Sequence, residues 1–267
     1  MENRFSIPLT KDLESWPTFI ELTERRNLFV HTGGKISSQY LQVCRANKVR
    51  LPENLQVGDL IGLNRQYLIQ AYNCLAEIGV KLAHVLWRKI RPDEREAADK
   101  NIIHVCYDLL VKEEYDLALI LLLFATQTLK KWSSEQNRRV LIVNLAIAYK
   151  WLGKEEHFLQ TLAAEDWTAC ALKFRLAISV LRDEFEEAAD LMKKIGARGE
   201  VTKIDYHDWP VFRRFRETLL FASTYKEVFG EEFLVAVEDA VAKELPLEDS
   251  KETRRESNQQ TEMPGAD

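Results

Sequence analysis

The segment ERRNLFVHTGG, residues 24–34, brings side chains capable of acid–base and phosphate chemistry into an otherwise apolar helical run. It holds Arg25, Arg26, Asn27 and His31. An imidazole can transfer protons near neutral pH because its unperturbed pKa is about 6.5. A guanidinium offers a phosphate a fixed fork of donors. These residues therefore either form a reaction site or only occupy the surface of a helix end.

A helix drawn at about 100° per residue separates these side chains into two groups. Glu21 and Arg25 form an i, i+4 ion pair on a face that we expect to be solvated. The same face carries Glu14, Thr18 and Leu28. The opposite, apolar arc carries Trp16, Phe19, Ile20, Leu22, Phe29 and Val30. Arg26 and Asn27 fall inside this arc, and His31 falls at its edge. We therefore expect Arg25 to point outward and Arg26 to point inward.

Burying an arginine and an asparagine among apolar neighbours is costly unless each finds a polar partner. One interpretation is structural: Arg26 pairs with a carboxylate, and His31 bonds a carbonyl group at the helix end. The other is that these side chains face a substrate, and the order of the residues around them favours that interpretation.

The run RNLFVH is an arginine, a polar residue, three apolar residues and a histidine, and TGGKISSQYL continues it with a glycine turn and a tyrosine-bearing helix. This pattern resembles the signature of the HEPN superfamily, helical domains found in many prokaryotic toxins and antiphage proteins. Their motif is an arginine, four to six further residues and a histidine, with Asn, Asp or His favoured after the arginine. The resemblance implies a HEPN-like helical region at the N-terminal end.

Active members of this superfamily are metal-independent ribonucleases, usually dimers with facing motif helices, so the resemblance implies an RNA substrate (possibly a tRNA) and no cofactor. His31 would be the general acid/base on the RNA 2′-hydroxyl or leaving group. Arg26 would hold the scissile phosphate, and Asn27 would orient His31 or the phosphate. Because only 25 residues precede Arg26, the helical bundle would be incomplete, or completed by residues 59–90 or by a partner subunit.

Composition and charge limit the classes of function. The net charge of −5 argues against a protein that coats nucleic acid. The longest apolar run, residues 117–125, is too short to span a bilayer, and MENRFSIPLT lacks the apolar core of a secretory signal. Four widely spaced cysteines without a CxxC pair argue against a zinc site and for a reducing compartment. We expect a cytoplasmic protein with no metal and no membrane association.

Apolar residues recur at spacings of three and four, which predicts an all-α fold. Helices are expected over residues 11–31, 37–46 and 59–90, with Gly33 and Gly34 ending the first of them. Pro92 can start the next helix. These elements make up the HEPN-like region, residues 1–92.

From residue 93 the pattern changes to helical hairpins. Residues 107–122, 146–162 and 177–192 each pair an apolar helix with a charged turn and a second apolar helix. They resemble irregular tetratricopeptide-type repeats, with Tyr115, Phe158 and Phe185 at comparable places; a generic helical bundle is the alternative. A further helix should start at Asp208 or Trp209 and end at Gly230. The hairpin region is expected to cover residues 93–246, and the polar residues 247–267 should be disordered.

The other residues that could belong to a functional site are more simply interpreted as structural or surface residues. The remaining histidines, which are His84, His104, His157 and His207, lie in different helices without a metal-binding or catalytic pattern, and we expect them to be structural or surface residues. The basic-aromatic stretch FRRFRETLLF, residues 212–221, could contact RNA, but is more often a helix whose arginines extend from the rim of a core.

The sequence thus predicts a HEPN-type endoribonuclease, a toxin or antiphage-defence effector whose hairpins bind a protein partner. The alternative is a non-catalytic interaction or scaffold protein with a degenerate or truncated HEPN dimerisation region, and an antitoxin-like regulator is a third interpretation. We expect a homodimer through the N-terminal region, because Trp16, Ile20 and Asn27 form a stripe wider than one short domain can cover.

Overall fold

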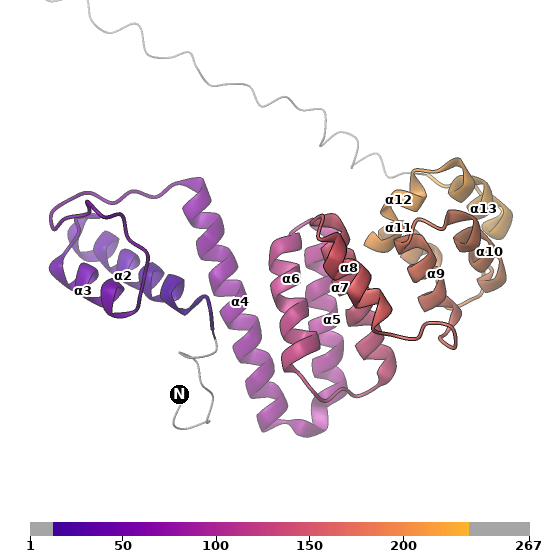
Figure 1. The fold of residues 1–267 in the computed structure, drawn as a ribbon, viewed down its shortest axis with the longest axis horizontal. Helices are drawn as coiled ribbons and strands as arrows, with labels where there is room; N and C mark the ends of the chain where they lie inside the picture. Colours follow the sequence, from indigo (N-terminus) through magenta and orange to yellow (C-terminus); the bar gives the residue numbers. More distant parts are fainter. Residues whose placement is uncertain (1–12, 235–267) are drawn as a thin grey trace, which may run out of the picture.

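A computed structural model describes residues 13–234, and these residues fold entirely into helices and connecting segments (Figure 1). The prediction of an all-α fold is therefore confirmed for this part of the chain. The only strand-like pairing in it is an isolated antiparallel bridge between Lys35 and Leu60. Within the same residues, no helix is both long and apolar enough to cross a membrane.

The N-terminal part of the described residues contains three helices, α2 (Trp16–Thr32), α3 (Ser38–Ala46) and α4 (Arg65–Ile90). Gly33 ends α2 in the left-handed conformation, at φ 60°. Asn64 caps α4 by accepting a hydrogen bond from the Tyr67 N–H at 2.7 Å. This cap explains why α4 begins at residue 65 and not at 59. A small apolar core fills the space between the first two helices and the following loop: Leu28, Ile36, Tyr40, Leu41 and Cys44.

Three helical hairpins follow the short 3₁₀ turn η1 (Pro92–Glu94). They pair α5 (Arg95–Val111) with α6 (Tyr115–Leu123), α7 (Glu135–Trp151) with α8 (Glu155–Ala163), and α9 (Leu172–Leu181) with α10 (Phe185–Ile195). The π-helical turn η2 (Phe124–Thr128) extends α6. The three hairpin turns share one backbone geometry, with Glu113, Gly153 and Asp183 at φ 61°, 66° and 61°. In each turn the next N–H donates to a carbonyl five residues back at 2.9 Å.

The shared turn geometry corrects one feature of the expected repeat. Tyr115 and Phe185 are the first residues of α6 and α10, but the corresponding residue of α8 is Glu155. Phe158 lies three residues further along, where the other hairpins place Ala118 and Ala188, and all three of these side chains are buried. The equivalence of Phe158 with the two other aromatic residues was therefore wrong.

The C-terminal part is made of short helices packed around aromatic rings. These are α11 (Lys203–Asp208), η3 (Pro210–Phe212), α12 (Arg213–Arg216) and α13 (Leu219–Phe229). The single helix expected from residue 208 or 209 is interrupted, because Thr218 starts a new one by capping the Phe221 N–H. Gly230 ends α13 as expected, with φ 73°.

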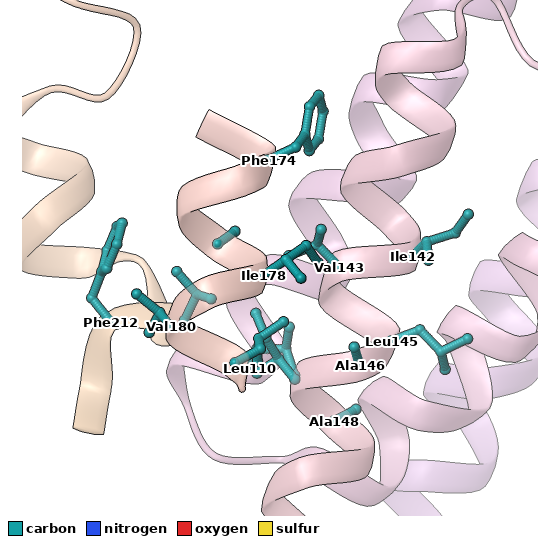
Figure 2. Close-up of a cluster of buried hydrophobic side chains, with 14 of the residues drawn as sticks. Leu110, Ile142, Val143, Leu145, Ala146, Ala148, Phe174, Ile178, Val180 and Phe212 are labelled. Atoms are coloured by element: carbon teal, nitrogen blue, oxygen red, sulfur yellow. The ribbon is translucent and has the colours of Figure 1, made fainter. Parts of the chain in front are cut away.

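One large apolar core runs through the hairpins and into the C-terminal helices. Figure 2 shows part of it, where Val143 of α7 and Ile178 of α9 meet between the two helices. Helix α4 stands between the α2–α3 pair and the hairpins (Figure 1). Its residues Ala76 and Val80 pack against the large core. The expected division at residues 92 and 93 stays a prediction, and the expected disordered tail, residues 247–267, lies outside the described residues.

Candidate functional site

The structure places the three expected catalytic residues on the surface near the end of α2. Arg26 and His31 are exposed, and Asn27 is half-buried. The Arg26 Nη1 donates a hydrogen bond of 3.3 Å to Asn27 Oδ1. His31 lies in the last turn, two residues before Gly33. The prediction that Arg26 points into an apolar environment was therefore wrong.

The prediction that Arg25 points into solvent was wrong as well. The face of α2 that was expected to be solvated is covered at Glu21 and Leu28, the two buried residues of the helix, whereas Thr18 on the same face is exposed as expected. Phe29 and Val30, placed on the apolar arc, are exposed by 36% and 56%. Helices α3 and α4 pack against α2, and these contacts reverse the expected orientation around Glu21 and Arg25. Trp16, Phe19 and Ile20 of the expected apolar arc are half-buried.

A hydrogen-bonded cluster around Glu21 explains this reversal. The Glu21 carboxylate accepts hydrogen bonds from Arg25 Nε at 2.6 Å, Tyr40 Oη at 2.7 Å and Tyr67 Oη at 3.0 Å. The Arg25 guanidinium also lies over the Tyr67 ring, 3.9 Å from its centre, and donates to the Gly62 carbonyl oxygen at 3.2 Å. Burial and the contact with Glu21 raise the pKa of Tyr40. The cluster joins α2, α3 and α4 and therefore stabilises the arrangement of these three helices.

The three buried cysteines of the described residues do not supply an activated nucleophile. Burial, with a smaller contribution from Glu21, raises the pKa of Cys44 to about 11. Burial also raises the pKa of Cys74 to about 11 and that of Cys106 to about 12. A thiol with such a pKa stays protonated at neutral pH, and the thiolate is the reactive form. These three side chains therefore act as small apolar residues.

A second buried polar cluster fastens α4 to the first hairpin. Asp99, with 0% exposure, forms an ion pair of 2.6 Å with Arg88 and accepts hydrogen bonds from the Ser133 N–H and hydroxyl at 2.6 Å each. His84, also buried, lies near this pair. Burial, followed by the charge of Arg88, lowers the pKa of His84. Its place in the core agrees with the structural role expected for it.

The basic-aromatic stretch at residues 212–221 is built into the core. Phe212, Phe215 and Phe221 are fully buried. Arg213 forms an ion pair of 2.6 Å with Glu113 and donates to the Tyr115 hydroxyl at 2.7 Å. This arrangement matches the structural interpretation of the stretch.

A surface cavity of about 350 Å³ lies where α5, α7, α9 and α11 come together. Its apolar walls are formed by Ile103, Val140, Phe174, Val201 and Trp209. Residues of α5, α7 and α9, the first helices of the three hairpins, form much of its lining. This side of the hairpins, formed by α5, α7 and α9, is called the inner face below.

Equivalent positions of the three hairpins meet in this cavity. His104, Asn144 and Phe174 each lie seven residues before the last residue of α5, α7 and α9, and all three line the cavity. His104 is exposed, whereas Asn144 and Phe174 are 1% and 3% exposed. The repeated hairpin geometry therefore produces a row of three side chains with different chemistry along the inner face.

Asn144 has unsatisfied hydrogen-bonding capacity. Neither its Nδ2 nor its Oδ1 has a hydrogen-bond partner among the described residues, although both atoms are buried. A buried polar group without a partner costs roughly 1–3 kcal/mol, and most native buried side-chain polar atoms are paired. Asn144 is also one of the residues that line the cavity.

The charged residues of the cavity are of both signs. Lys173 forms an ion pair of 3.7 Å with Glu200, and its backbone N–H donates to the same carboxylate at 3.0 Å. Asp205 is held by the capping box of Thr202, and Lys100 adds a positive charge at the rim. Burial, followed by Asp208 and Asp205, raises the pKa of Tyr107 to about 12, so its hydroxyl stays neutral. The cavity is therefore close to neutral overall.

The cavity offers apolar surface, charged groups and hydrogen-bonding groups to a ligand. Its residues include no nucleophile bonded to a base, and no three His, Cys, Asp or Glu side chains of residues 13–234 are grouped so that they could hold a metal ion. Sequence analysis missed Asn144. The available signal was a single amide within the apolar run VLIVNLAIAY.

The described residues define a class, an all-helical fold with three helical hairpins in series and a polar–apolar cavity on their inner face. Comparison with known proteins assigns the chain to no family. No family model matches it, and no curated protein or solved structure matches it either.

Proposed function

We propose that this protein is an interaction protein that binds an extended segment of a partner polypeptide on the inner face of its hairpins. The observation that carries this proposal is the buried amide of Asn144, which lacks a partner at the wall of an open cavity. A side-chain amide offers one acceptor and two donors. A main-chain peptide group offers one of each, so the two can form a complementary pair of hydrogen bonds.

The walls around Asn144 support a polypeptide ligand. Phe174 and Trp209 provide apolar surface for one ligand side chain, while the amide holds the neighbouring main chain. The mixed charges of Lys173 and Glu200 suit a neutral segment better than a phosphate backbone, which requires a continuous basic path. The geometry therefore favours a polypeptide over a nucleic acid at this site.

A selection experiment tests this function. A displayed library of random peptides would be enriched on the wild-type protein and then measured on Asn144→Leu, which removes the amide but keeps a side chain of similar size. We expect the enriched peptides to bind the variant at least about tenfold more weakly, the loss that corresponds to one hydrogen bond. Gln160→Leu on α8, outside the cavity, is the control and should bind as the wild type does. Equal binding to both variants would contradict the proposal.

A second proposal is metal-independent RNA cleavage by Arg26, Asn27 and His31, in a protein of the toxin or antiphage-defence type. The observation in its favour is that Arg26 and His31 are both exposed, with the Arg26 guanidinium bonded to Asn27. Five residues along a helix correspond to about 140° of rotation and about 7.5 Å of rise. One helix therefore presents the two side chains in different directions, and a complete site would need a second copy.

RNA cleavage in the presence of a chelator tests the second proposal. His31→Ala should lower the rate by roughly two to four orders of magnitude, because proton transfer would be lost. His157→Ala, at another exposed histidine, is the matched control, and Arg45→Ala is the control for Arg26→Ala. Cleavage that survives His31→Ala would exclude this site.

A further inference from the structure

Helix α4 carries a stripe of apolar side chains that face solvent. Leu68, Tyr72 and Leu75 are exposed by 55%, 58% and 52%. Their spacing of four and then three residues keeps them on one face of the helix, and Gly79 continues the stripe four residues later. These four residues are called the α4 stripe. Surface helices of soluble proteins normally carry polar residues on such a face, so the stripe is a candidate interface.

The other faces of α4 already have partners. Tyr67 and Cys74 contact α2 through Glu21 and the Ser15 carbonyl oxygen. Ala76 and Val80 pack against the large core. The exposed stripe therefore lies on the remaining side of the helix.

Residues 66–76 of α4 are also free of charge. No charged residue occurs from Gln66 to Ala76, although charged residues make up 30% of the chain. A partner with a strongly charged surface would meet no countercharge there. An apolar, uncharged partner surface would fit the α4 stripe.

We propose that the α4 stripe is a homodimer interface, in which two α4 helices pack antiparallel about a two-fold axis. The axis passes between Tyr72 and Leu75, so that Tyr72 packs against the partner's Leu75 and Leu68 packs against the partner's Gly79. A spacing of four, three and four residues reads the same in both directions along the helix. An antiparallel helix pair about a two-fold axis requires such a pattern, because each contact is repeated with its two residues exchanged between the chains.

The space at Gly79 and the absence of charge on the α4 stripe both suit a second copy of this chain as the partner. A side chain added at Gly79 would meet no heavy atom within 4 Å, so there is room for a leucine from the partner. Small residues at a helix crossing also allow the two helices to approach closely. A chain with net charge −5 repels its own copy on average. The uncharged stripe avoids this repulsion.

This interface differs from the one expected from the sequence. Trp16 and Ile20, the apolar members of the expected stripe on α2, are half-buried within the chain. The α4 stripe is more exposed and lies on another helix. The proposal depends on neither of the proposed functions, because it rests on α4 alone.

Sedimentation equilibrium at tens of micromolar protein (a range of our choosing) tests the dimer. The wild type should sediment as a dimer. Leu75→Glu and Tyr72→Lys should each sediment as a monomer, because each would bury unpaired charges at the interface. Leu159→Glu makes the same kind of change at a residue of α8 that is 54% exposed, and it should remain dimeric. Circular dichroism would verify that each variant is folded, as expected for exposed positions.

Mixing the two monomeric variants tests the register. In the antiparallel arrangement, the lysine that Tyr72→Lys introduces in one chain would face the glutamate that Leu75→Glu introduces in the other. An equimolar mixture of the two variants should therefore form a heterodimer, in which the other half of the interface keeps the wild-type pair. A monomeric wild-type protein, or a dimer that survives both substitutions, would overturn the proposal. A mixture that stays monomeric would overturn the antiparallel register.

Discussion

Tyr67, in the first turn of α4, donates a hydrogen bond of 3.0 Å to Glu21, a buried residue 46 positions earlier in α2. This bond connects two helices that the sequence separates by a long loop. Tyr40 of α3 bonds the other carboxylate oxygen at 2.7 Å. The orientation of the N-terminal helices thus depends on one carboxylate.

We predict a graded loss of stability when the donors to Glu21 are removed. Tyr40→Phe should lower the free energy of unfolding by about 1.5–3 kcal/mol, the usual range for a hydrogen bond to a charged group. Tyr67→Phe should cost less, because Tyr67 is only half-buried, its bond is longer and its ring still contacts Arg25. Urea denaturation followed by circular dichroism measures both. If the two variants were as stable as the wild type, the carboxylate would not hold these helices together.

We predict that Asn144→Leu makes the protein more stable. The substitution replaces a buried amide that lacks a partner with an apolar side chain of similar volume, in a core made of apolar residues. The gain should be about 1–3 kcal/mol, the desolvation cost of an unpaired polar group. Thermal denaturation measures it. A large loss of stability would show that the Asn144 amide serves the fold and not a ligand.

We predict that His84 makes stability decrease in mild acid. Burial and Arg88 lower its pKa in the folded state, opposed by smaller effects of Asn101 and Asp99. The unfolded chain, with a pKa of about 6.5, therefore takes up the proton first as the pH falls. The free energy of unfolding should drop below about pH 6.5, by at most about 1.4 kcal/mol per pH unit from this group.

Comparing two histidine variants isolates this effect. His84→Gln should reduce the difference in stability between pH 7.5 and pH 5.5 (two values chosen to bracket the titration). His157→Gln, at an exposed position, should leave that difference unchanged. Equal differences in His84→Gln and the wild type would assign the acid sensitivity to other groups.

We predict that the hairpins are stable only together with α4. A fragment of residues 93–234 would lose Arg88, the partner of Asp99 at 2.6 Å, and would uncover the part of the large core that Ala76 and Val80 contact. Removing one partner of a buried ion pair typically costs about 3–5 kcal/mol. A fragment of residues 65–234 should therefore melt at a clearly higher temperature by circular dichroism. Equal melting temperatures would place the domain boundary at residues 92 and 93.

The sequence was sufficient for most helices of the fold, although not for the interrupted helices after residue 208, and insufficient for the faces that the helices bury. Periodic apolar residues predict the helices, and Gly33 and Gly230 mark two of their ends correctly. The burial of Glu21 could not be predicted, because it depends on hydroxyl groups supplied by Tyr40 and Tyr67 from other helices. A helical wheel shows only which residues share a face. It cannot show which face a later helix will cover.

Asn144 illustrates a second limit. An amide within an apolar run predicts burial, and in most proteins such an amide is bonded within the core. Only the contacts of the folded chain show that this one has no partner. The feature that supports the proposed function is thus a buried amide without a hydrogen-bond partner. A sequence alone does not show whether such a partner is present.

The length of α9 determines the depth of the cavity. Helix α7 has 17 residues and α9 has 10, a difference of about 10 Å along the helix axis. Because their last residues occupy equivalent positions, the first two turns of α7 have no counterpart in α9. Asn137 and Val140 lie in this overhang, and both line the cavity. A version of this chain with two more turns in α9 would keep its three hairpins but have a closed inner face.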